Sequence, residues 1–248
     1  LEKLRWLTLH RKGATLVHYN RYEIPKKTGG QRLISAPKPD LANAQHWVLD
    51  EILGKIPVES QAHGFVSGRN IVSAALPHTN REVVINLDLE NFFPTVTFRR
   101  VKGMFKGFGY CEHVATLFGL LCTEPPRIEA KLDGTSYYIA LGERVLPQGA
   151  CTSPAITNIL CRKLDRRLVG MATSLGFTYT RYADDLTFSG DDPSLVGRLL
   201  QAVRMIIGEE GFVENQAKTR VMRRGRRQEV TGLTVNDKVT VSRKERRK

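Results

Sequence analysis

The sequence contains no apolar run long enough to cross a membrane, and it has only four cysteines in 248 residues. A membrane-spanning helix needs about 20 consecutive apolar residues, and the first twenty positions are too charged for a signal peptide. The cysteines show no Cys-x-x-Cys spacing and no histidines at metal-ligand spacing. They are Cys111, Cys122, Cys151 and Cys161. We therefore expect no zinc site, no disulfide framework and no membrane partner, and a reducing cytoplasm as the location.

Acidic residues are scarce relative to basic ones. The chain has 25 Asp and Glu against 38 Lys and Arg, a formal net charge of +13. This excess favours a polyanionic partner such as nucleic acid, although membrane attachment or solubility alone could also explain it. Basic residues concentrate at 99–102, 223–227 and 243–248. These stretches could contact phosphates without reading sequence, or form a solvated face, which fits the last stretch best.

Two adjacent carboxylates, Asp184 and Asp185, follow Tyr182 at the tip of a predicted β-hairpin. Apolar and polar residues alternate in the flanks, 177–181 and 186–189, as is typical of half-buried strands. Adjacent carboxylates repel each other and lose hydration at such a tip, and a divalent cation relieves both costs. The alternative is that the Asp-Asp pair simply forms a turn.

A third carboxylate, Asp88, ends the short β-branched run at 83–88, which predicts a buried strand. If this strand lies beside the hairpin, three anionic oxygen ligands gather where Mg²⁺ could bind and still accept water and phosphates. Two such ions ~3.5–4 Å apart can activate an attacking hydroxyl and stabilise a leaving pyrophosphate. Alone, Asp88 could equally be a strand-ending cap.

Local patterns predict the remaining elements. Ser153 and Pro154 suit the cap and first turn of a helix that continues to about residue 172. A helix at 41–53 is expected to bury Ala44, Trp47, Val48, Ile52 and Leu53. The other predictions are a strand at 33–36, two helices within 97–123, a hairpin of strands 127–132 and 135–141, and a helix at 195–210.

Five motifs occur in a characteristic order: the Asp88 strand, LPQGACTSP at 146–154, YADD at 182–185, NQAKT at 215–219 and VTGL at 230–233. In this order they closely resemble reverse transcriptases. The segment QAHGFVSGRNIV at 61–72, the nearby His78 and the Val-Thr-Gly element resemble the bacterial retron type. The similarity runs from about residue 20 to about 242. The chain departs from the retron pattern in AALPH at 74–78, where Asn-Ala-x-x-His is usual, and in Cys151, where the loop often has proline or serine.

The resemblance implies an α+β fold with the fingers and palm of a right-hand polymerase. The element order fits a ferredoxin-like palm, with an antiparallel sheet and helices on one face. We expect fingers in 1–80, with further finger elements in 105–145, and a palm in 81–241. Residues 242–248 would be a basic tail or the start of a thumb that is absent or truncated, so we expect a fragment with a complete active site and a poor grip on primer-template.

The resemblance implies that Asp88, Asp184 and Asp185 hold two Mg²⁺ ions, which Mn²⁺ could replace, with help from the carbonyl of Leu89. Lys218 would be the general acid for the leaving pyrophosphate, or else an ordinary surface lysine.

The nucleotide site is implied in the same way. Arg32 would contact phosphates from a basic hairpin that includes Lys26 and Lys27, unless this is only an exposed basic turn. Phe93 would be an aromatic gate against ribose 2′-hydroxyls, although either Phe92 or Phe93 should be a core residue. The nucleotide-binding residues expected are Arg32, Phe93, Gln148, Gly149 and Tyr182.

Contacts to primer or RNA are expected from Arg69, Val230, Thr231 and Gly232. His63 and His78 lie in the retron-like segment, where they could touch RNA or only pack.

The function implied is an RNA-directed DNA polymerase that uses dNTPs on an RNA template with an RNA or DNA primer. The retron resemblance adds a cognate structured non-coding RNA as template and primer, and an effector protein in antiviral defence. Two alternatives remain: an RNA-directed RNA polymerase, which more often has glycine before the paired aspartates, and a non-catalytic RNA-binding protein derived from a polymerase.

Overall fold

The chain passes three times between two structural units in the computed structural model, which describes residues 2–8, 11–25 and 29–241. Unit 1 consists of Leu1–Ile56 and Phe93–Thr157, and unit 2 consists of Pro57–Phe92 and Asn158–Lys248. These bounds differ from the expected division into 1–80 and 81–241, because the segment after residue 56 packs with the second unit. Along the described ranges, no helix is both long and apolar enough to span a membrane.

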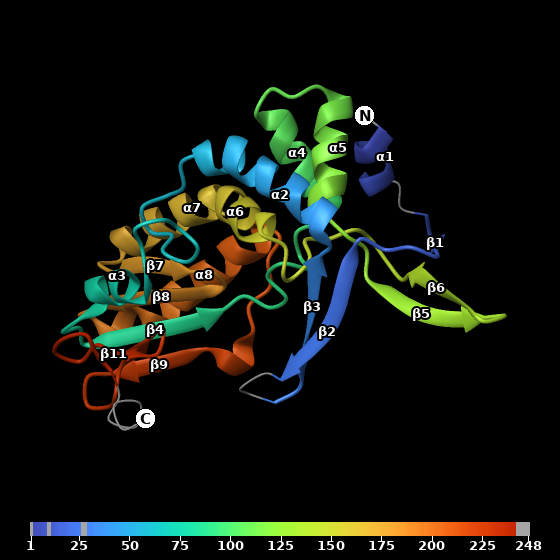
Figure 1. Cartoon of the computed structure of the whole chain (residues 1–248). Helices are drawn as coiled ribbons and strands as arrows, with labels where there is room; N and C mark the ends of the chain where they lie inside the picture. Colours follow the sequence, from blue (N-terminus) through green and yellow to red (C-terminus); the bar gives the residue numbers. More distant parts are fainter. Residues whose placement is uncertain (1, 9–10, 26–28, 242–248) are drawn as a thin grey trace. The chain divides into compact units, whose positions relative to one another are not determined.

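Unit 2 is built on a four-stranded antiparallel sheet with the order β7-β8-β4-β9. Its strands are β4 (Val83–Asp88), β7 (Thr178–Tyr182), β8 (Asp185–Gly190) and β9 (Arg220–Arg223). Helix α7 (Arg162–Ser174) precedes β7 and helix α8 (Val196–Glu209) precedes β9, and both cover one face of the sheet (Figure 1). This βαββαβ connection is the ferredoxin-like pattern expected from the sequence.

The sheet forms because its central strand is apolar on both faces. Val83, Ile85 and Leu87 on one face of β4 are buried, and so is Val84 on the other face; Phe188 of β8 is buried opposite Ile85. Such continuous burial needs cover on both sides of a strand, and the β-branched run at 83–85 supplies the side chains. The strand therefore ends where polarity returns, at Asp88.

A smaller sheet and a short helix complete unit 2. Strands β10 (Glu229–Val230), β11 (Leu233–Thr234) and β12 (Thr240–Val241) pair antiparallel. Helix α3 (Ile71–Ala75) begins with a capping box between Asn70 and Ser73 and leads into the 3-10 turn η2 (Leu76–His78). An apolar cluster joins them to the main sheet. It contains Ala75, Val84, Val230, Leu233 and Val235.

His78 belongs to this packing. Its ring is fully buried, and its nitrogens lie 2.7 Å from the hydroxyls of Ser189 and Thr180. A ring without solvent exposure cannot touch RNA, so the packing interpretation is correct.

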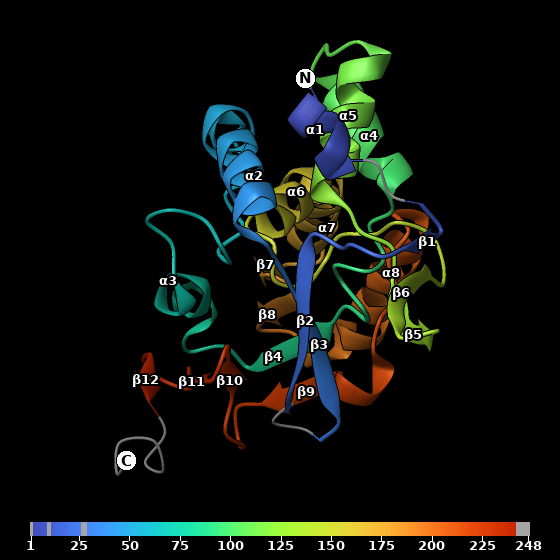
Figure 2. The ribbon, with the colours of Figure 1, turned by 45° about the vertical axis from the view of Figure 1, so that its right-hand side comes forward.

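Unit 1 combines helices with a three-stranded sheet and a long hairpin (Figure 2). The sheet has the order β1-β6-β5, and strands β2 and β3 form the hairpin. The strands of unit 1 are β1 (Gly13–Ala14), β2 (Tyr19–Pro25), β3 (Gln31–Pro37), β5 (Arg127–Leu132) and β6 (Thr135–Ala140). Its helical elements are α1 (Glu2–Thr8), α2 (Pro39–Glu51), η1 (Leu53–Lys55), α4 (Phe98–Gly107) and α5 (Glu112–Cys122). Helix α6 (Thr152–Leu160) crosses the boundary between the two units.

Most of the predicted elements are present, including both helices within 97–123, the 127–141 hairpin and the helix at 195–210. The single helix expected from 153 to about 172 is wrong. It is divided at Cys161, whose carbonyl accepts the first hydrogen bond of α7, from Asp165 N.

The expected burial of Trp47 is also wrong. Trp47 is 55% exposed, and the buried face of α2 has Gln45 instead. The amide nitrogen of Gln45 donates to the Tyr19 hydroxyl and to the Leu121 carbonyl inside unit 1, whereas the buried Oε1 of the same side chain has no hydrogen-bond partner.

Candidate active site

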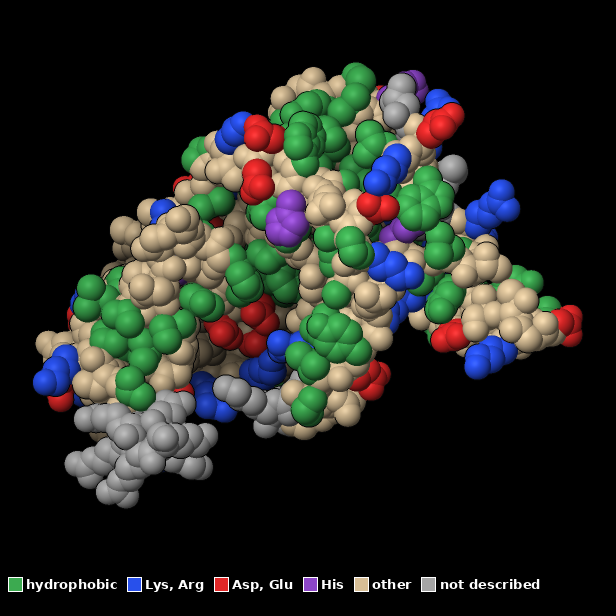
Figure 3. Space-filling view, viewed as in Figure 1, with side chains coloured by type: hydrophobic (Ala, Val, Ile, Leu, Met, Phe, Trp, Pro, Cys, Tyr) green, Lys and Arg blue, Asp and Glu red, His purple; other side chains and the backbone are tan. Residues whose placement is uncertain are grey.

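Strand pairing brings the three aspartates to one end of the sheet of unit 2. Asp88 is the register partner of Asp185 across β4 and β8, and Asp184 precedes Asp185 in the turn. The backbone N–H of Leu89 donates to the Asp184 carbonyl at 3.0 Å, which ties the end of β4 to the turn. Figure 3 shows acidic side chains gathered on the surface over the end of β4.

The turn between β7 and β8 has only two residues, Ala183 and Asp184, because Tyr182 pairs with Asp185. Ala183 has φ of +57°, in the left-handed region that residues with a Cβ rarely adopt. Tyr182 is half-buried at the end of β7. A short turn limits the movement of the two carboxylates that it holds.

Lys218 contacts Asp88 directly. Its ammonium lies 2.9 Å from both carboxylate oxygens, and the Asn215 N–H donates to the Asp88 carbonyl. The 3-10 turn η4 (Gln216–Lys218) places the lysine there. The side chain of Asp88 is 13% exposed, whereas that of Lys218 is 49% exposed and so can move.

The carboxylates perturb one another. Loss of hydration, followed by repulsion from Asp184 and Asp88, raises the pKa of Asp185 to about 7, and Lys218 opposes the shift. Asp185 is solvent-exposed as a residue, so repulsion from the two neighbouring carboxylates is the better supported cause of this shift. A site that strains a carboxylate in this way is one that a cation would stabilise.

The chemistry of the donors fits a hard divalent cation, because all three side chains offer carboxylate oxygens. Within the described ranges, however, no three Asp, Glu, His or Cys side chains converge as a ready-made metal centre. Lys218 occupies both oxygens of Asp88 in this arrangement. Cation binding at all three aspartates would therefore require the ammonium to leave Asp88.

Unit 1 brings together two of the expected nucleotide-binding segments. The Ser35 N–H of β3 donates to the Gln148 carbonyl at 2.7 Å. Gly149 has φ of +121°, and a Cβ there would lie 2.9 Å from Ile34, so only glycine fits against this strand. Arg32 is exposed on the same strand. Lys26 and Lys27 lie outside the described residues, as does the basic stretch 243–248.

The two phenylalanines after Asp88 differ in burial. Phe92 is buried in unit 2, with its ring centroid 5.8 Å from that of Phe212. Phe92 is therefore the core residue of the pair. Phe93 is half-buried and starts the second segment of unit 1.

The expected RNA contacts lie in unit 2. The Arg69 guanidinium donates to the carbonyls of Glu59, Ser60 and Ala62, and so supports the loop before α3. Val230, Thr231 and Gly232 do form a turn, with positive φ at Thr231 and Gly232. The Thr231 hydroxyl donates to the Ile71 carbonyl.

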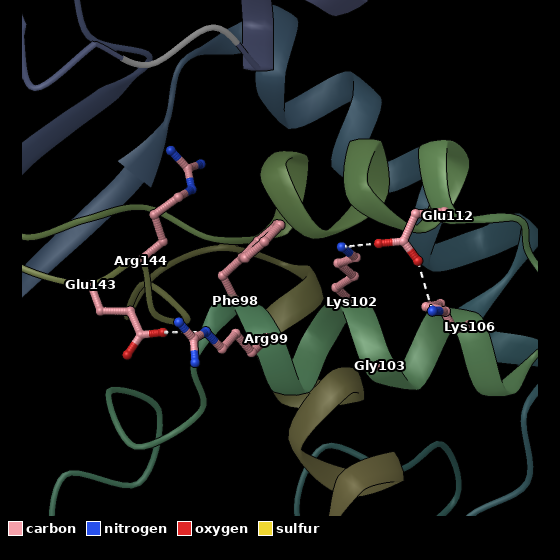
Figure 4. Close-up of a pocket in the computed structure, with 8 residues that line it drawn as sticks. All are labelled: Phe98, Arg99, Lys102, Gly103, Lys106, Glu112, Glu143 and Arg144. Atoms are coloured by element: carbon pink, nitrogen blue, oxygen red, sulfur yellow. Dashed lines mark ion pairs between the residues drawn. The ribbon is translucent and has the colours of Figure 1, made fainter.

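A groove of about 530 Å³ lies along α4 in unit 1 (Figure 4). Four cationic side chains and two acidic ones line it, and Lys102 and Lys106 both pair with Glu112. These hydrogen bonds lower the pKa of the exposed Glu112 carboxyl to about 2. The lining residues are Phe98, Arg99, Lys102, Gly103, Lys106, Glu112, Glu143 and Arg144.

The sequence did not lead us to a buried polar network beside the hairpin of β7 and β8. Arg181, Asp165 and Asn158 are all buried. The available signal was Arg181 itself, a charged residue at an inward position of the alternating β7 pattern.

Comparison with known proteins shows the family. A sequence model described as "Reverse transcriptase (RNA-dependent DNA polymerase)" matches residues 24–238. Among curated proteins, the Mx162 retron reverse transcriptase of Myxococcus xanthus is 49% identical over 95% of this chain and 51% of its own length. The Mx65 enzyme of that organism is 48% identical over 98% of this chain and 57% of its own length. The chain thus spans about half the length of these relatives.

Solved structures share the fold. A Candida albicans telomerase bound to a telomeric RNA fragment has a TM-score of 0.58 at 12% identity, covering 88% of this chain and 45% of that one. A foamy viral protease-reverse transcriptase with double-stranded DNA has a TM-score of 0.51 at 16% identity, covering 92% of this chain and 31% of that one. The α+β polymerase fold is thereby confirmed. The chain belongs to the reverse transcriptase family and, within it, to the bacterial retron type.

Proposed function

We propose that this chain is the catalytic part of an RNA-directed DNA polymerase of the retron type. The observation that carries the proposal is the register of β4 and β8, which sets Asp88 opposite Asp185 and beside Asp184. Three carboxylates at one end of a ferredoxin-like sheet suit nucleotidyl transfer that depends on two cations.

Asp88, Asp184 and Asp185 would hold the ions, with the carbonyl of Leu89 as a further ligand. Bound Mg²⁺, or Mn²⁺ in its place, would activate the primer 3′-hydroxyl and stabilise the charge on the leaving pyrophosphate. Lys218, released from Asp88, would give a proton to that pyrophosphate. Its exposure and its position beside Asp88 support this role.

Residues of unit 1 would bind the incoming nucleotide. Arg32 would contact its phosphates, Gln148 and Gly149 would border its sugar and base pair, and Phe93 would exclude a ribose 2′-hydroxyl. The hydrogen bond between Ser35 and Gln148 supports this grouping because it joins the Arg32 strand to the Gln148 loop. Tyr182, at the end of β7 in unit 2, would be a further nucleotide-binding residue.

We assign the palm to the sheet of unit 2 and the fingers to unit 1. The ferredoxin-like topology supports the first assignment, and the basic hairpin of β2 and β3 supports the second. Arg69, Val230, Thr231 and Gly232 of unit 2 would contact the primer or RNA. A thumb would follow residue 241.

The partners would be an RNA template and an RNA or DNA primer, with a cognate structured RNA serving as both. Arg99, Lys102 and Lys106 on α4 would contact phosphates of the RNA backbone. The net positive charge of the groove and of the chain supports this role. A cytoplasmic location, which the low cysteine content without Cys-x-x-Cys spacing supports, and an effector protein, which the retron resemblance implies, complete the proposal.

Primer extension on an RNA template tests the function. We expect Mg²⁺-dependent incorporation of dNTPs, which the double variant Asp184→Asn with Asp185→Asn abolishes. Preferential use of NTPs would instead favour an RNA polymerase. RNA binding without extension by wild-type protein extended to the length of its relatives would favour a non-catalytic RNA-binding protein.

A further inference from the structure

Ala183, in the turn between β7 and β8, has a backbone conformation that is unfavourable for a residue with a Cβ. Glycine would adopt its left-handed φ of +57° without strain, but alanine does so only against its own Cβ. The peptide groups on both sides of Ala183 set the direction in which Asp184 and Asp185 leave the turn. Neighbouring residues must therefore hold this backbone in place.

Arg181 holds it from inside unit 2. Its side chain has no solvent exposure, and it binds both oxygens of the equally buried Asp165 at 2.8 Å. Its Nη1 donates to the Ala183 carbonyl at 3.1 Å and to Asn158 Oδ1 at 3.0 Å. The Tyr179 hydroxyl donates to Asp165 Oδ1. Because the two charges neutralise each other and are hydrogen-bonded, the guanidinium is fixed in one orientation.

Gly64 holds the turn from the other side. A Cβ on Gly64 would lie 2.5 Å from the backbone nitrogen of Ala183, closer than any side chain could fit. The loop that contains Gly64 is anchored to β7, because Arg181 N donates to the Gln61 carbonyl and His63 N donates to the Arg181 carbonyl.

Asn158 joins the two supports. Its Oδ1 accepts from Arg181, and its Nδ2 donates to the Gly64 carbonyl at 2.9 Å. The amide is buried, and both ends of it are used. The contacts thus form a closed ring. Ala183 accepts from Arg181, Arg181 donates to Asn158, Asn158 donates to Gly64, and Gly64 packs against Ala183.

We propose that Arg181, Asn158 and Gly64 are positioning residues that fix the Ala183 turn and so hold Asp184 and Asp185 in the geometry that binds divalent cations. None of the three touches the reacting atoms. The inference rests on the proposed function for the role of the aspartates, and it adds the residues that orient them. Outer residues that orient metal ligands typically contribute about 10- to 100-fold in metal affinity or activity.

The test compares Gly64→Ala and Asn158→Ala with wild type and with Gly170→Ala. Gly170 is the matched control, because it lies in α7 of the same unit and a Cβ there meets nothing within 4 Å. Asn158→Ala keeps the buried pair of Arg181 and Asp165 and is therefore the variant chosen to fold. Mn²⁺ binding to protein without RNA is measured by electron paramagnetic resonance, with the double Asp184→Asn and Asp185→Asn variant as reference. Hydrogen exchange of the 182–187 segment is measured beside it.

We expect both test variants to bind Mn²⁺ about 10-fold or more weakly and to exchange the hairpin amides faster, with Gly170→Ala unchanged. In primer extension, kcat should fall while KM for dNTP stays within about twofold, because the nucleotide-binding residues of unit 1 are untouched. Wild-type Mn²⁺ affinity and wild-type exchange in both variants would overturn the proposal. If Gly64→Ala does not fold, Asn158→Ala decides alone. If the wild-type protein binds Mn²⁺ but never extends a primer, the proposed polymerase function is wrong. The Mn²⁺ affinities of the variants then still decide whether these residues position the aspartates.

Discussion

The Lys218 ammonium lies 2.9 Å from each carboxylate oxygen of Asp88, although the two residues are 130 positions apart in the sequence. A cation bound by Asp88 and the ammonium of Lys218 would compete for the same oxygens. The same pairing keeps the lysine beside the place where pyrophosphate would leave. Lys218 is therefore expected to weaken metal binding and to assist proton transfer.

We predict that Lys218→Ala binds Mn²⁺ more tightly and turns over more slowly. Removing an exposed ion pair worth about 0.5–1 kcal/mol should raise affinity about two- to fivefold. Losing the general acid should lower kcat about 10²-fold. Mn²⁺ titration and single-turnover extension measure the two effects, with Lys238→Ala as control on the loop between β11 and β12. Unchanged affinity would show that Lys218 does not compete with the cation, and an unchanged kcat would remove it from the mechanism.

Phe93→Ala should admit ribonucleotides. A half-buried ring at the sugar position would exclude a 2′-hydroxyl, and its loss should reduce the preference for dNTP over NTP about 10- to 100-fold. The ratio of kcat/KM values for matched dNTP and NTP measures this preference. Phe98→Ala is the control, because it removes another half-buried ring of unit 1 that packs at Gly119. Equal discrimination in both variants and wild type would refute the gate.

Local pattern was sufficient for three of the four strands of the sheet that carries the aspartates. The β-branched run before Asp88 and the alternation around Asp184 and Asp185 identify β4, β7 and β8, and the order of predicted helices and strands fits the ferredoxin-like topology. Contacts between distant residues were beyond this reasoning. The buried Gln45 donates from its amide nitrogen to the Tyr19 hydroxyl and the Leu121 carbonyl, and neither partner is visible in the helix pattern.

The burial of Arg181 near the active site also depends on a distant residue that the local sequence pattern does not reveal. A charged residue is assigned to the surface unless its partner is known, and Asp165 lies 16 positions earlier on a different element. The sequence predicted which carboxylates gather at the end of β4. It could not predict that a buried ion pair supports their turn, or that Lys218 binds Asp88, since both depend on how the sheet closes.

Charge removal in the α4 groove should weaken RNA binding without affecting chemistry. Arg99→Gln combined with Lys106→Gln removes two candidate phosphate contacts, so the slope of log affinity against log salt should fall by about 1.5 to 2. Fluorescence anisotropy with a labelled RNA at several salt concentrations measures the slope. Lys55→Gln is the control, because Lys55 is an exposed lysine of unit 1 that also has an acidic partner, Glu51. At saturating RNA, kcat should stay unchanged. A salt slope equal to that of wild type would exclude the groove from the RNA interface.

His78 should make stability depend on pH. Burial, followed by the nearby charges of Arg81 and His63, lowers the pKa of His78 from 6.5 to about 3. The unfolded chain therefore takes up a proton below pH 6.5 that the folded protein refuses, and the free energy of unfolding falls as the pH is lowered. From pH 7 to pH 5 this histidine should cost up to about 2 kcal/mol, at about 1.4 kcal/mol per unit below pH 6.5.

His78→Gln keeps hydrogen-bonding groups between Ser189 and Thr180 but cannot be protonated. Urea unfolding at pH 5, 6, 7 and 8 should show a smaller loss of stability toward pH 5 in this variant than in wild type. Carboxylates that titrate in the same range affect both proteins equally, so the difference between them isolates the imidazole. His46→Gln, at an exposed position on α2, controls for replacing a histidine elsewhere. Parallel stability curves for wild type and His78→Gln would show that His78 accepts a proton inside the folded protein, in contradiction to its burial between two hydroxyls.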